Sequence, residues 1–314
     1  MDSVAASRRS KFGMHLAAEK ITKRHVLKIV LDLMIIAAIS VPIIVLHAVV
    51  WPYRRGFYCD DVSIRYPYKE STVSGTHLGL IAFPLPLLII TVVEWFRITY
   101  YERRRYNETI IATKLSSGNA YALVVRLYFF FGYFLCGAAA NEFSTDLGKF
   151  IIGRLRPNFL DVCRPNVGYT ICSDHIYISN FTCSSNDLYR IKDARLSFPS
   201  GHSSWSAYTM LFTVIYLQAR LKWRVGSELV KPFIQFLLLC IAFAVALSRI
   251  SDFKHHWSDV LAGSFLGSLI AILLTAYVMK IFELEGKHFA QFFKEHLPAQ
   301  EMVTLNEPKA MASP

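Results

Sequence analysis

Hydrophobic positions in this chain form long unbroken runs, separated by polar and charged segments. Six runs approach the roughly 20 residues that a helix needs to cross a bilayer. They predict membrane-spanning helices at Ile29–Trp51, Leu78–Phe96, Ala120–Ala140, Ser203–Ala219, Pro232–Ser248 and Val260–Met279. The expected fold is an all-α integral membrane protein with six transmembrane helices in one bundle. An even number of spans places both termini on the same side of the membrane.

Composition supports this interpretation. The chain is 54% hydrophobic, and no segment resembles a detachable soluble domain, so residues 1–314 are expected to form one six-span domain. The net charge of +11 is dispersed around the hydrophobic runs instead of being gathered on one polar face. That distribution argues against a nucleic-acid partner. The first run is too long for the core of a signal peptide, so we expect an uncleaved span.

The distribution of Lys and Arg predicts the orientation. Of the 34 basic residues, 20 lie in the segments on the N-terminal side of the membrane. The positive-inside rule therefore places residues 1–28 and the tail 294–314 in the cytosol, and the tail is expected to be partly disordered. The loops expected outside the cytosol are Pro52–His77, Asn141–His202 and Arg249–Asp259.

Cysteine positions agree with this topology. Four cysteines lie in the outer loops, where disulfides can form: Cys59, Cys163, Cys172 and Cys183. Three complete pairings are open to them, and the sequence does not choose among these. Cys136 and Cys240 fall in spans, where we expect them to pack as small apolar residues.

Two sequons match the pattern for N-linked glycosylation. Asn180-Phe-Thr182 lies in the second outer loop, so Asn180 is expected to carry a glycan. Asn107-Glu-Thr109 lies on the predicted cytosolic side and should remain unmodified. Only the first sequon is therefore compatible with the topology.

Ionisable residues and prolines mark unusual positions in the spans. Asp32 and Glu94 lie near predicted cytosolic ends, so both are expected to be solvated at the interface. Arg126 is expected to extend its guanidinium outward toward the headgroups. Pro84 and Pro86 should bend the second span, because each removes a backbone donor.

Three polar motifs fall on the predicted outer face: Lys149 to Arg156-Pro157, then Pro199-Ser200-Gly201-His202, then Ser248-Arg249 through His255 to Asp259. Lys149, Arg156 and Arg249 supply cations. Ser200 and Gly201 supply backbone N–H groups where a helix should begin, which is a natural anion site. These groups fit a phosphate monoester, because phosphoryl transfer concentrates charge on the phosphoryl oxygens.

The two histidines can divide the chemistry. His255 is the candidate nucleophile, and Asp259 is expected beside it on helical spacing, fixing its tautomer. His202 is the candidate acid that protonates the leaving group and then activates water. His256 is about 100° of helix turn away from His255, so it is expected to face another partner. No metal is required for this scheme.

Other interpretations of the last motif are open. Its His and Asp could solvate the start of a helix in a polar connecting loop. A metal site of His255, His256 and Asp259 is weaker, because the nearby Lys and Arg would surround the ion with positive charge.

The three motifs, in this order, resemble those of the type 2 phosphatidic acid phosphatase superfamily: Lys-x6-Arg-Pro, Pro-Ser-Gly-His and Ser-Arg-x5-His-x3-Asp. A closer resemblance, to the lipid phosphate phosphatases or phospholipid phosphatases, covers most of the chain. It includes Tyr66-Pro-Tyr-Lys-Glu70, Gly153-Arg-Leu-Arg-Pro157, Phe159-Leu-Asp-Val-Cys163, Gly201-His-Ser-Ser204 and Lys254-His-His-Trp-Ser-Asp259. Non-enzymatic relatives lose catalytic residues, whereas the motif residues are all present here.

This resemblance implies a six-span enzyme with an extracytosolic site that is independent of Mg²⁺. Its substrates would be phosphatidate, lysophosphatidate, sphingosine 1-phosphate and ceramide 1-phosphate. The family pattern assigns Lys149, Arg156 and Arg249 to phosphate binding, His202 to acid catalysis, His255 to nucleophilic attack and Asp259 to its orientation. It also suggests a homo-oligomer among membrane lipids, and we expect the plasma membrane, although the sequence does not distinguish it from internal membranes.

Two other functions remain open at this point. The same pocket could take a soluble or an isoprenoid phosphate. A non-catalytic lipid-binding scaffold in the membrane is a different class of function, and the intact His202 and His255 argue against it.

Overall fold

The structure is a computed structural model that describes residues 26–102, 115–167, 175–221 and 227–282. The chain divides into two units, residues 38–279 and residues 1–37 with 280–314. In the second unit, residues 26–37 are helical. The first unit contains all three motifs. One candidate span, Val26–Ala48, begins in the second unit and continues into the first.

Among the described residues, five helices are long and apolar enough to cross a membrane: Val26–Ala48, Gly75–Tyr100, Leu123–Ile152, Val230–Ser251 and Trp257–Val278. They overlap five of the six predicted spans and confirm a mostly helical membrane protein. The third lies within α5 (Leu115–Ile152), and the fourth coincides with α9 (Val230–Ser251). The fifth joins α10 (Trp257–Ile272) to the π-helix η3 (Leu273–Val278).

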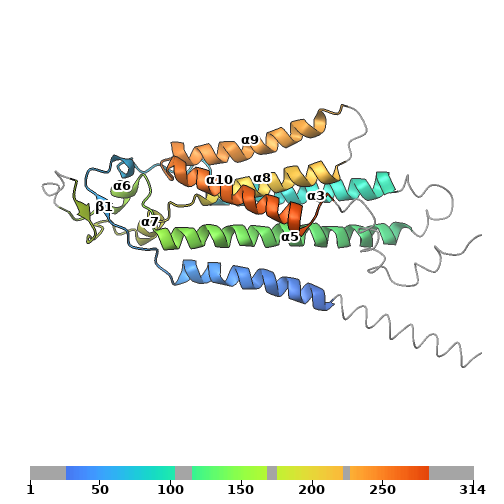
Figure 1. Cartoon of the computed structure of the whole chain (residues 1–314), viewed down its shortest axis with the longest axis horizontal. Coiled ribbons are helices and arrows are strands. Elements are labelled where there is room, and N and C mark those ends of the chain that lie inside the picture. Colours follow the sequence, from blue (N-terminus) through green and yellow to red (C-terminus); the bar gives the residue numbers. More distant parts are fainter. Residues whose placement is uncertain (1–25, 103–114, 168–174, 222–226, 283–314) are drawn as a thin grey trace, which may run out of the picture. The chain divides into compact units, whose positions relative to one another are not determined.

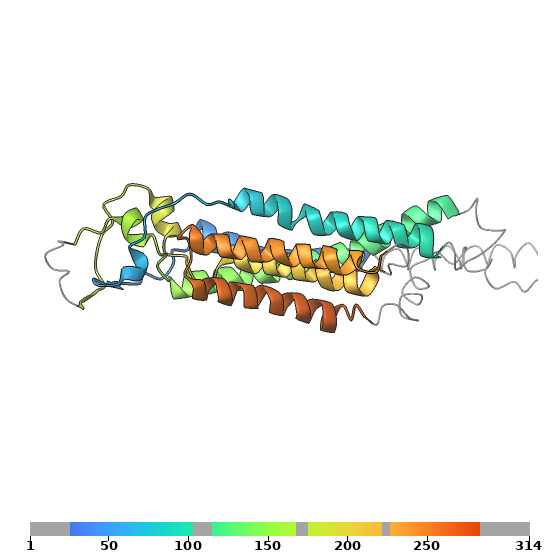
Figure 2. The ribbon, with the colours of Figure 1, turned by 90° about the horizontal axis from the view of Figure 1, so that it is seen from above.

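The remaining predicted span corresponds to α8 (Gly201–Arg220), which has 20 residues. This helix packs against α10, α9 and α5, and it lies among them in both views (Figures 1 and 2). Its inward positions carry many small hydroxyl residues: Ser203, Ser204, Ser206, Thr209 and Thr213. These residues lower its hydropathy, because an enclosed helix does not need a fully apolar surface. The six-span count therefore stays a prediction.

The second span is interrupted at its prolines. The helix α2 (Gly75–Ala82) ends two residues before Pro84, where α3 (Pro84–Phe96) begins, and the π-helix η2 (Arg97–Glu102) follows α3. Proline has no backbone N–H for the preceding turn, which explains the break at this point. The interruption falls at the prolines, and the bend of the span stays a prediction.

A small folded cap lies at one end of the helices (Figure 1). It contains β1 (Phe57–Tyr58) paired antiparallel with β2 (Tyr177–Ile178), the short 3-10 helix η1 (Val62–Ile64), α6 (Phe159–Cys163) and α7 (Leu188–Asp193). Phe57, Ile64, Leu155 and Phe159 form a buried apolar cluster in it. The cap is built from the first two predicted outer loops.

Disulfides hold this cap together. Cys163 is bonded to Cys183, 20 residues later in the chain. A bridge that closes a loop of this length contributes roughly 3 kcal/mol to stability. Cys59 is also disulfide-bonded. Cys172, the fourth cysteine of the outer loops, lies outside the described residues.

The last span packs closely on α8 through two glycines. A Cβ on Gly263 would collide with the carbonyl oxygen of Ser200, and a Cβ on Gly267 would collide with that of Ser204. Only glycine permits this approach of two backbones. The start of α8 is thereby held against α10.

The structure contradicts the expected interfacial solvation of Glu94 and Arg126. Glu94 is fully buried, and its carboxylate binds Arg126 Nη1 at 3.2 Å and Arg220 Nε at 2.9 Å. Tyr216 OH donates to the same carboxylate at 2.9 Å. The partners in this network could not be predicted, because its members come from α3, α5 and α8 and meet only in the folded bundle. Asp32, by contrast, is exposed.

Candidate active site

The three motifs meet at the ends of four helices, α5, α8, α9 and α10. Lys149 lies in the last turn of α5, His202 in the first turn of α8 and Arg249 in the last turn of α9. His255 lies in the turn between α9 and α10. One expectation needs correction, because the predicted loop that starts at Asn141 is helical as far as Ile152. A rigid helix, and not a loop, therefore carries Lys149.

The second motif begins α8. Ser200 is the N-cap residue, and its side chain accepts a hydrogen bond from the Ser203 backbone N–H. The Ser200 backbone N–H donates to the Asp259 carbonyl at 3.0 Å, which ties this helix start to α10. A Cβ on Gly201 would lie 3.0 Å from Lys149 Nζ, so the ammonium of Lys149 lies directly against the helix start. Cation and helix N-terminus therefore face the same space, as an anion site requires.

His255 is buried and held in one orientation. Its Nδ1 lies 2.7 Å from the carbonyl oxygen of Ser197. A carbonyl can only accept, so Nδ1 carries the proton and Nε2 keeps the lone pair that a nucleophile needs. Burial lowers the pKa of His255 well below its usual value; Arg156 and Lys149 lower it further, and the Ser197 carbonyl opposes them. The neutral, nucleophilic form is therefore favoured.

The expected direct hydrogen bond between His255 and Asp259 does not form. Their closest atoms, Nδ1 and Oδ2, are 4.0 Å apart. Helical spacing does not apply, because α10 begins at Trp257 and His255 precedes it. Asp259 instead accepts from Ser197 Oγ at 2.6 Å, and Ser197 in turn holds His255. Asp259 thus acts on His255 through Ser197.

His256 is the histidine that contacts Asp259. Its Nδ1 and its backbone N lie 3.2 and 3.0 Å from Asp259 Oδ2. Arg154 Nη1 donates to Asp259 Oδ1, which completes the surroundings of this buried carboxylate. Sequence reasoning missed Arg154 and Ser197. Arg154 belongs to the Gly-Arg-Leu-Arg-Pro segment, which was a usable signal, whereas a backbone carbonyl leaves none.

His202 faces the cations of the other two motifs. Within the described residues, its Nε2 is buried without a hydrogen-bond partner. Burial, which is the largest cause, together with Arg249, Arg156 and Lys149 lowers the pKa of His202, which directly precedes the predicted span Ser203–Ala219, to about 4. The geometry agrees for Lys149, whose ammonium lies against Gly201, the residue before His202. An unpaired buried ring nitrogen next to three cations is the arrangement expected around an anion.

Each of the three predicted phosphate ligands is paired with a carboxylate. Lys149 Nζ lies 2.8 Å from Asp146, Arg156 Nη2 lies 2.6 Å from Asp193, and Arg249 Nη2 lies 2.9 Å from Asp252: these pairs belong to α5, the α6–α7 region and the end of α9. The carboxylates hold the cations in place and partly neutralise them.

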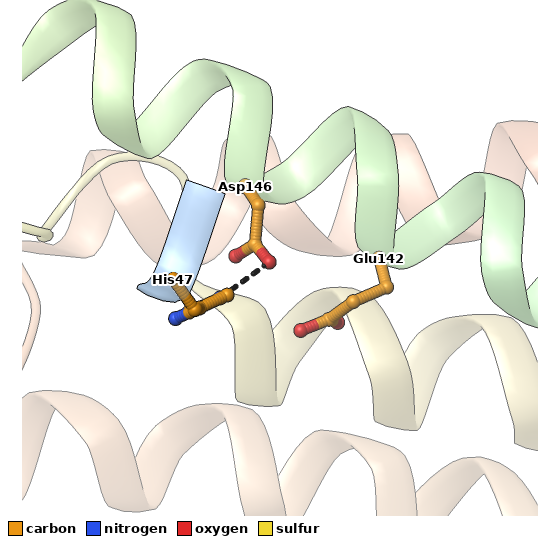
Figure 3. A group of neighbouring side chains, drawn as sticks. All are labelled: His47, Glu142 and Asp146. Carbon is orange, nitrogen blue, oxygen red and sulfur yellow. Dashed lines mark hydrogen bonds and ion pairs between the residues drawn. The ribbon is translucent and has the colours of Figure 1, made fainter. Parts of the chain in front are cut away.

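Asp146 belongs to a second group, with His47 and Glu142, whose ligand atoms lie within 4.8 Å of one another (Figure 3). These atoms could bind a metal ion. However, Asp146 already accepts from His47 Nε2 at 2.7 Å and from the Lys149 ammonium. A divalent ion would have to share Asp146 with Lys149, and the repulsion opposes binding. We therefore interpret the group as a support for Lys149.

The comparisons with known proteins agree with this geometry. The PAP2 superfamily matches residues 117–283, which contain all three motifs. Phospholipid phosphatase 1 of Rattus norvegicus is 41% identical over 81% of this chain and 86% of its own length. Phospholipid phosphatase 2 of Mus musculus is 40% identical over 81% of this chain and 87% of its own length. No solved structure matches the chain significantly.

The chain therefore belongs to the PAP2 superfamily. Within it, the relatives that share about two fifths of its residues over most of both chains are named phospholipid phosphatases. The human phospholipid phosphatase 2 adds to these, at 39% identity over 81% of this chain and 84% of its own length.

Proposed function

We propose that this chain is a membrane phosphatase that hydrolyses lipid phosphate monoesters, without Mg²⁺, through a phosphohistidine intermediate. Phosphatidate, lysophosphatidate, sphingosine 1-phosphate and ceramide 1-phosphate are the proposed substrates. The observation that carries the proposal is the geometry around His255. A buried imidazole with its proton fixed on Nδ1 lies among Lys149, Arg156 and His202.

In the first step, His255 Nε2 attacks the phosphorus and the bond to the lipid oxygen breaks. Lys149, Arg156 and Arg249 compensate the charge on the phosphoryl oxygens, together with the N–H groups at the start of α8. His202 gives its proton to the leaving alkoxide, so the lipid departs as an alcohol. In the second step, His202 takes a proton from water, which attacks the phosphohistidine and releases inorganic phosphate.

The pKa of His202 fits this role only when phosphate is bound. In the empty site, burial and three cations lower the pKa to about 4, so the imidazole is neutral at physiological pH. A phosphate dianion would offset the cations and raise that pKa. Substrate binding therefore supplies the condition under which His202 carries the proton that the leaving group needs.

The position of the site favours a lipid substrate. Lys149, Arg249 and His255 lie at the ends of candidate spans, so a headgroup can reach them while acyl chains stay in the bilayer. The Cys163–Cys183 disulfide is typical of a compartment outside the cytosol, and Asn180 is exposed, as a glycosylated residue must be. We propose an extracytosolic site at the plasma membrane, with both termini in the cytosol.

The test is phosphate release by the purified protein from a panel of lipid phosphates, with and without a chelator. We expect release from long-chain lipid phosphates that the chelator leaves unchanged. Faster release from a sugar phosphate or an isoprenoid diphosphate would replace the lipid substrate. Binding of lipid phosphates without any phosphate release would indicate a non-catalytic scaffold and refute the proposed enzymatic function.

A further inference from the structure

Lys254 is a buried cation whose role the three motifs leave open. It directly precedes His255 in the turn between α9 and α10, and only 5% of its surface is exposed. The turn is rigid, because the backbone N–H groups of Lys254 and His255 both donate to the Arg249 carbonyl, at 3.1 and 3.2 Å. Phe253 adopts a left-handed φ of 54° and stacks on Tyr66 at 4.6 Å. This left-handed conformation is unfavourable for a phenylalanine, so the surrounding structure must hold the segment in its inward orientation.

The ammonium of Lys254 lies 3.9 Å from the centre of the Tyr68 ring. Within the described part of the chain, it has no hydrogen-bond or ion-pair partner. Lys149, Arg156 and Arg249 differ in this respect, because each is paired with a carboxylate. Of these four described cations, Lys254 is thus the one without an anion.

A buried, unpaired ammonium is unfavourable in a folded protein. The electron-rich face of Tyr68 compensates part of the lost hydration, but it leaves the N–H donors of the ammonium without acceptors. Such a group is expected either to lose its proton or to find an anion. The backbone indicates where that anion lies, since Lys254 directly precedes the candidate nucleophile His255 and its N–H is bonded to the carbonyl of Arg249 at 3.1 Å.

We propose that Lys254 is a fourth phosphate-binding residue, whose ammonium donates to an oxygen of the substrate phosphoryl group beside Arg156 and Arg249, and that Tyr68 holds it in the empty site. This inference rests on the proposed function. It places a binding residue next to the nucleophile in the chain, so the same rigid turn aims both at one phosphoryl group.

The pKa of Lys254 supports this assignment. Burial, which is the largest cause, together with Arg156 and Arg249 lowers the pKa of Lys254 to about 8 against the opposing effect of Asp193 and Asp252. A phosphate dianion would raise this pKa again and fix the proton.

The experiment compares Lys254→Met, which keeps the length of the side chain, with Lys254→Arg, which keeps its charge. For Lys254→Met we expect roughly a tenfold or greater rise in KM for a lipid phosphate and in the inhibition constant of vanadate, as for a lost hydrogen bond to a charged group. We expect Lys254→Arg to recover much of the affinity. Lys69→Met is the matched control, because Lys69 lies nearby, bonded to Asp252 at 3.5 Å, but is 54% exposed.

Vanadate binding should also be followed by thermal unfolding, which does not depend on turnover. Vanadate should raise the Tm of the wild type and of Lys69→Met, and clearly less that of Lys254→Met. If Lys254→Met is folded but keeps the wild-type KM and vanadate response, the assignment of Lys254 is wrong. If Lys254→Met does not fold, Lys254→Gln replaces it, and an unchanged KM and vanadate affinity in that variant would also contradict the assignment of Lys254.

The two proposals fail differently. A wild-type protein that releases phosphate from no lipid phosphate would refute the proposed function itself. If the wild type is active and the Lys254→Met variant has the same KM and vanadate response, only the role of Lys254 is refuted.

Discussion

The bundle contains two clusters of buried charge, and they are built in opposite ways. Around Glu94, one carboxylate is bonded to two guanidinium groups and a tyrosine hydroxyl, on three different helices. Around His255, Lys149, Arg156 and Arg249 each have their own carboxylate, and within the described part of the chain His202 Nε2 is buried without a hydrogen-bond partner. The Glu94 carboxylate is bonded by protein groups alone, whereas the second cluster keeps a buried ring nitrogen that a bound anion would contact. Residue types alone would not separate a structural network from a site.

The largest effect is expected at the nucleophile. Replacing His255 with Ala should reduce phosphate release by roughly 10⁴-fold or more, as when a covalent catalyst is removed, while the Tm stays near that of the wild type. The control is His175→Ala, because His175 is an exposed histidine paired with Asp60 in the cap. Phosphate release by a folded His255→Ala protein at a tenth of the wild-type rate would contradict the assigned role.

The next effect concerns stability and not chemistry. Glu94→Gln leaves Arg126 and Arg220 buried without their carboxylate. We expect the free energy of unfolding to fall by about 3–5 kcal/mol, as when one partner of a buried ion pair is removed. Thermal unfolding in detergent should show a markedly lower Tm, with KM for the folded fraction unchanged. A raised KM at normal stability would mean that the two clusters are functionally connected.

A smaller effect is expected at the support of Lys149. Asp146→Asn removes the charge that fixes this ammonium, so KM should rise by roughly tenfold. The matched variant is Glu142→Gln, one helical turn away, because the Glu142 carboxylate accepts from Trp205 Nε1, whereas Asp146 is the member of the group that binds the Lys149 ammonium. Equal losses in both variants would show that the group acts only on the packing of α5.

The smallest effect is a change of affinity with pH. Below about pH 8, Lys254 is charged; above it the free protein loses this cation, so KM should rise as the pH passes 8. The groups that set this pKa are Arg156, Arg249, Asp193 and Asp252. A phosphate monoester is already fully ionised at this pH and does not add to the change. In Lys254→Arg the rise should disappear, and its persistence would assign it to another group.

Features that depend on residues close together in the chain could be predicted from the sequence, whereas contacts between distant segments could not. Long hydrophobic runs predicted α3, α9 and α10, because their signal lies within one segment. The three motifs predicted which residues would gather, since each carries its own chemistry. The pairing of His255 with Asp259 was predicted wrongly, because the spacing rule assumes a helix that begins only at Trp257.

Contacts between distant segments could not be predicted. The carbonyl of Ser197 fixes His255, and any residue supplies a carbonyl, so no side chain announces it. Glu94 was expected to be solvated because its two arginines lie 32 and 126 positions further along the chain. The span Ser203–Ala219 was predicted, but the enclosure of its hydroxyl residues by other helices was not, because that burial depends on distant segments.

The contact between Gly263 and Ser200 has a consequence for reading sequence variants. On a hydropathy scale, glycine to alanine in the middle of a transmembrane helix looks harmless. Here the added methyl group would push against the carbonyl of the residue that caps α8, one position before Gly201 and two before His202. An inherited change buried among apolar neighbours could therefore silence the enzyme without altering any residue that meets the lipid.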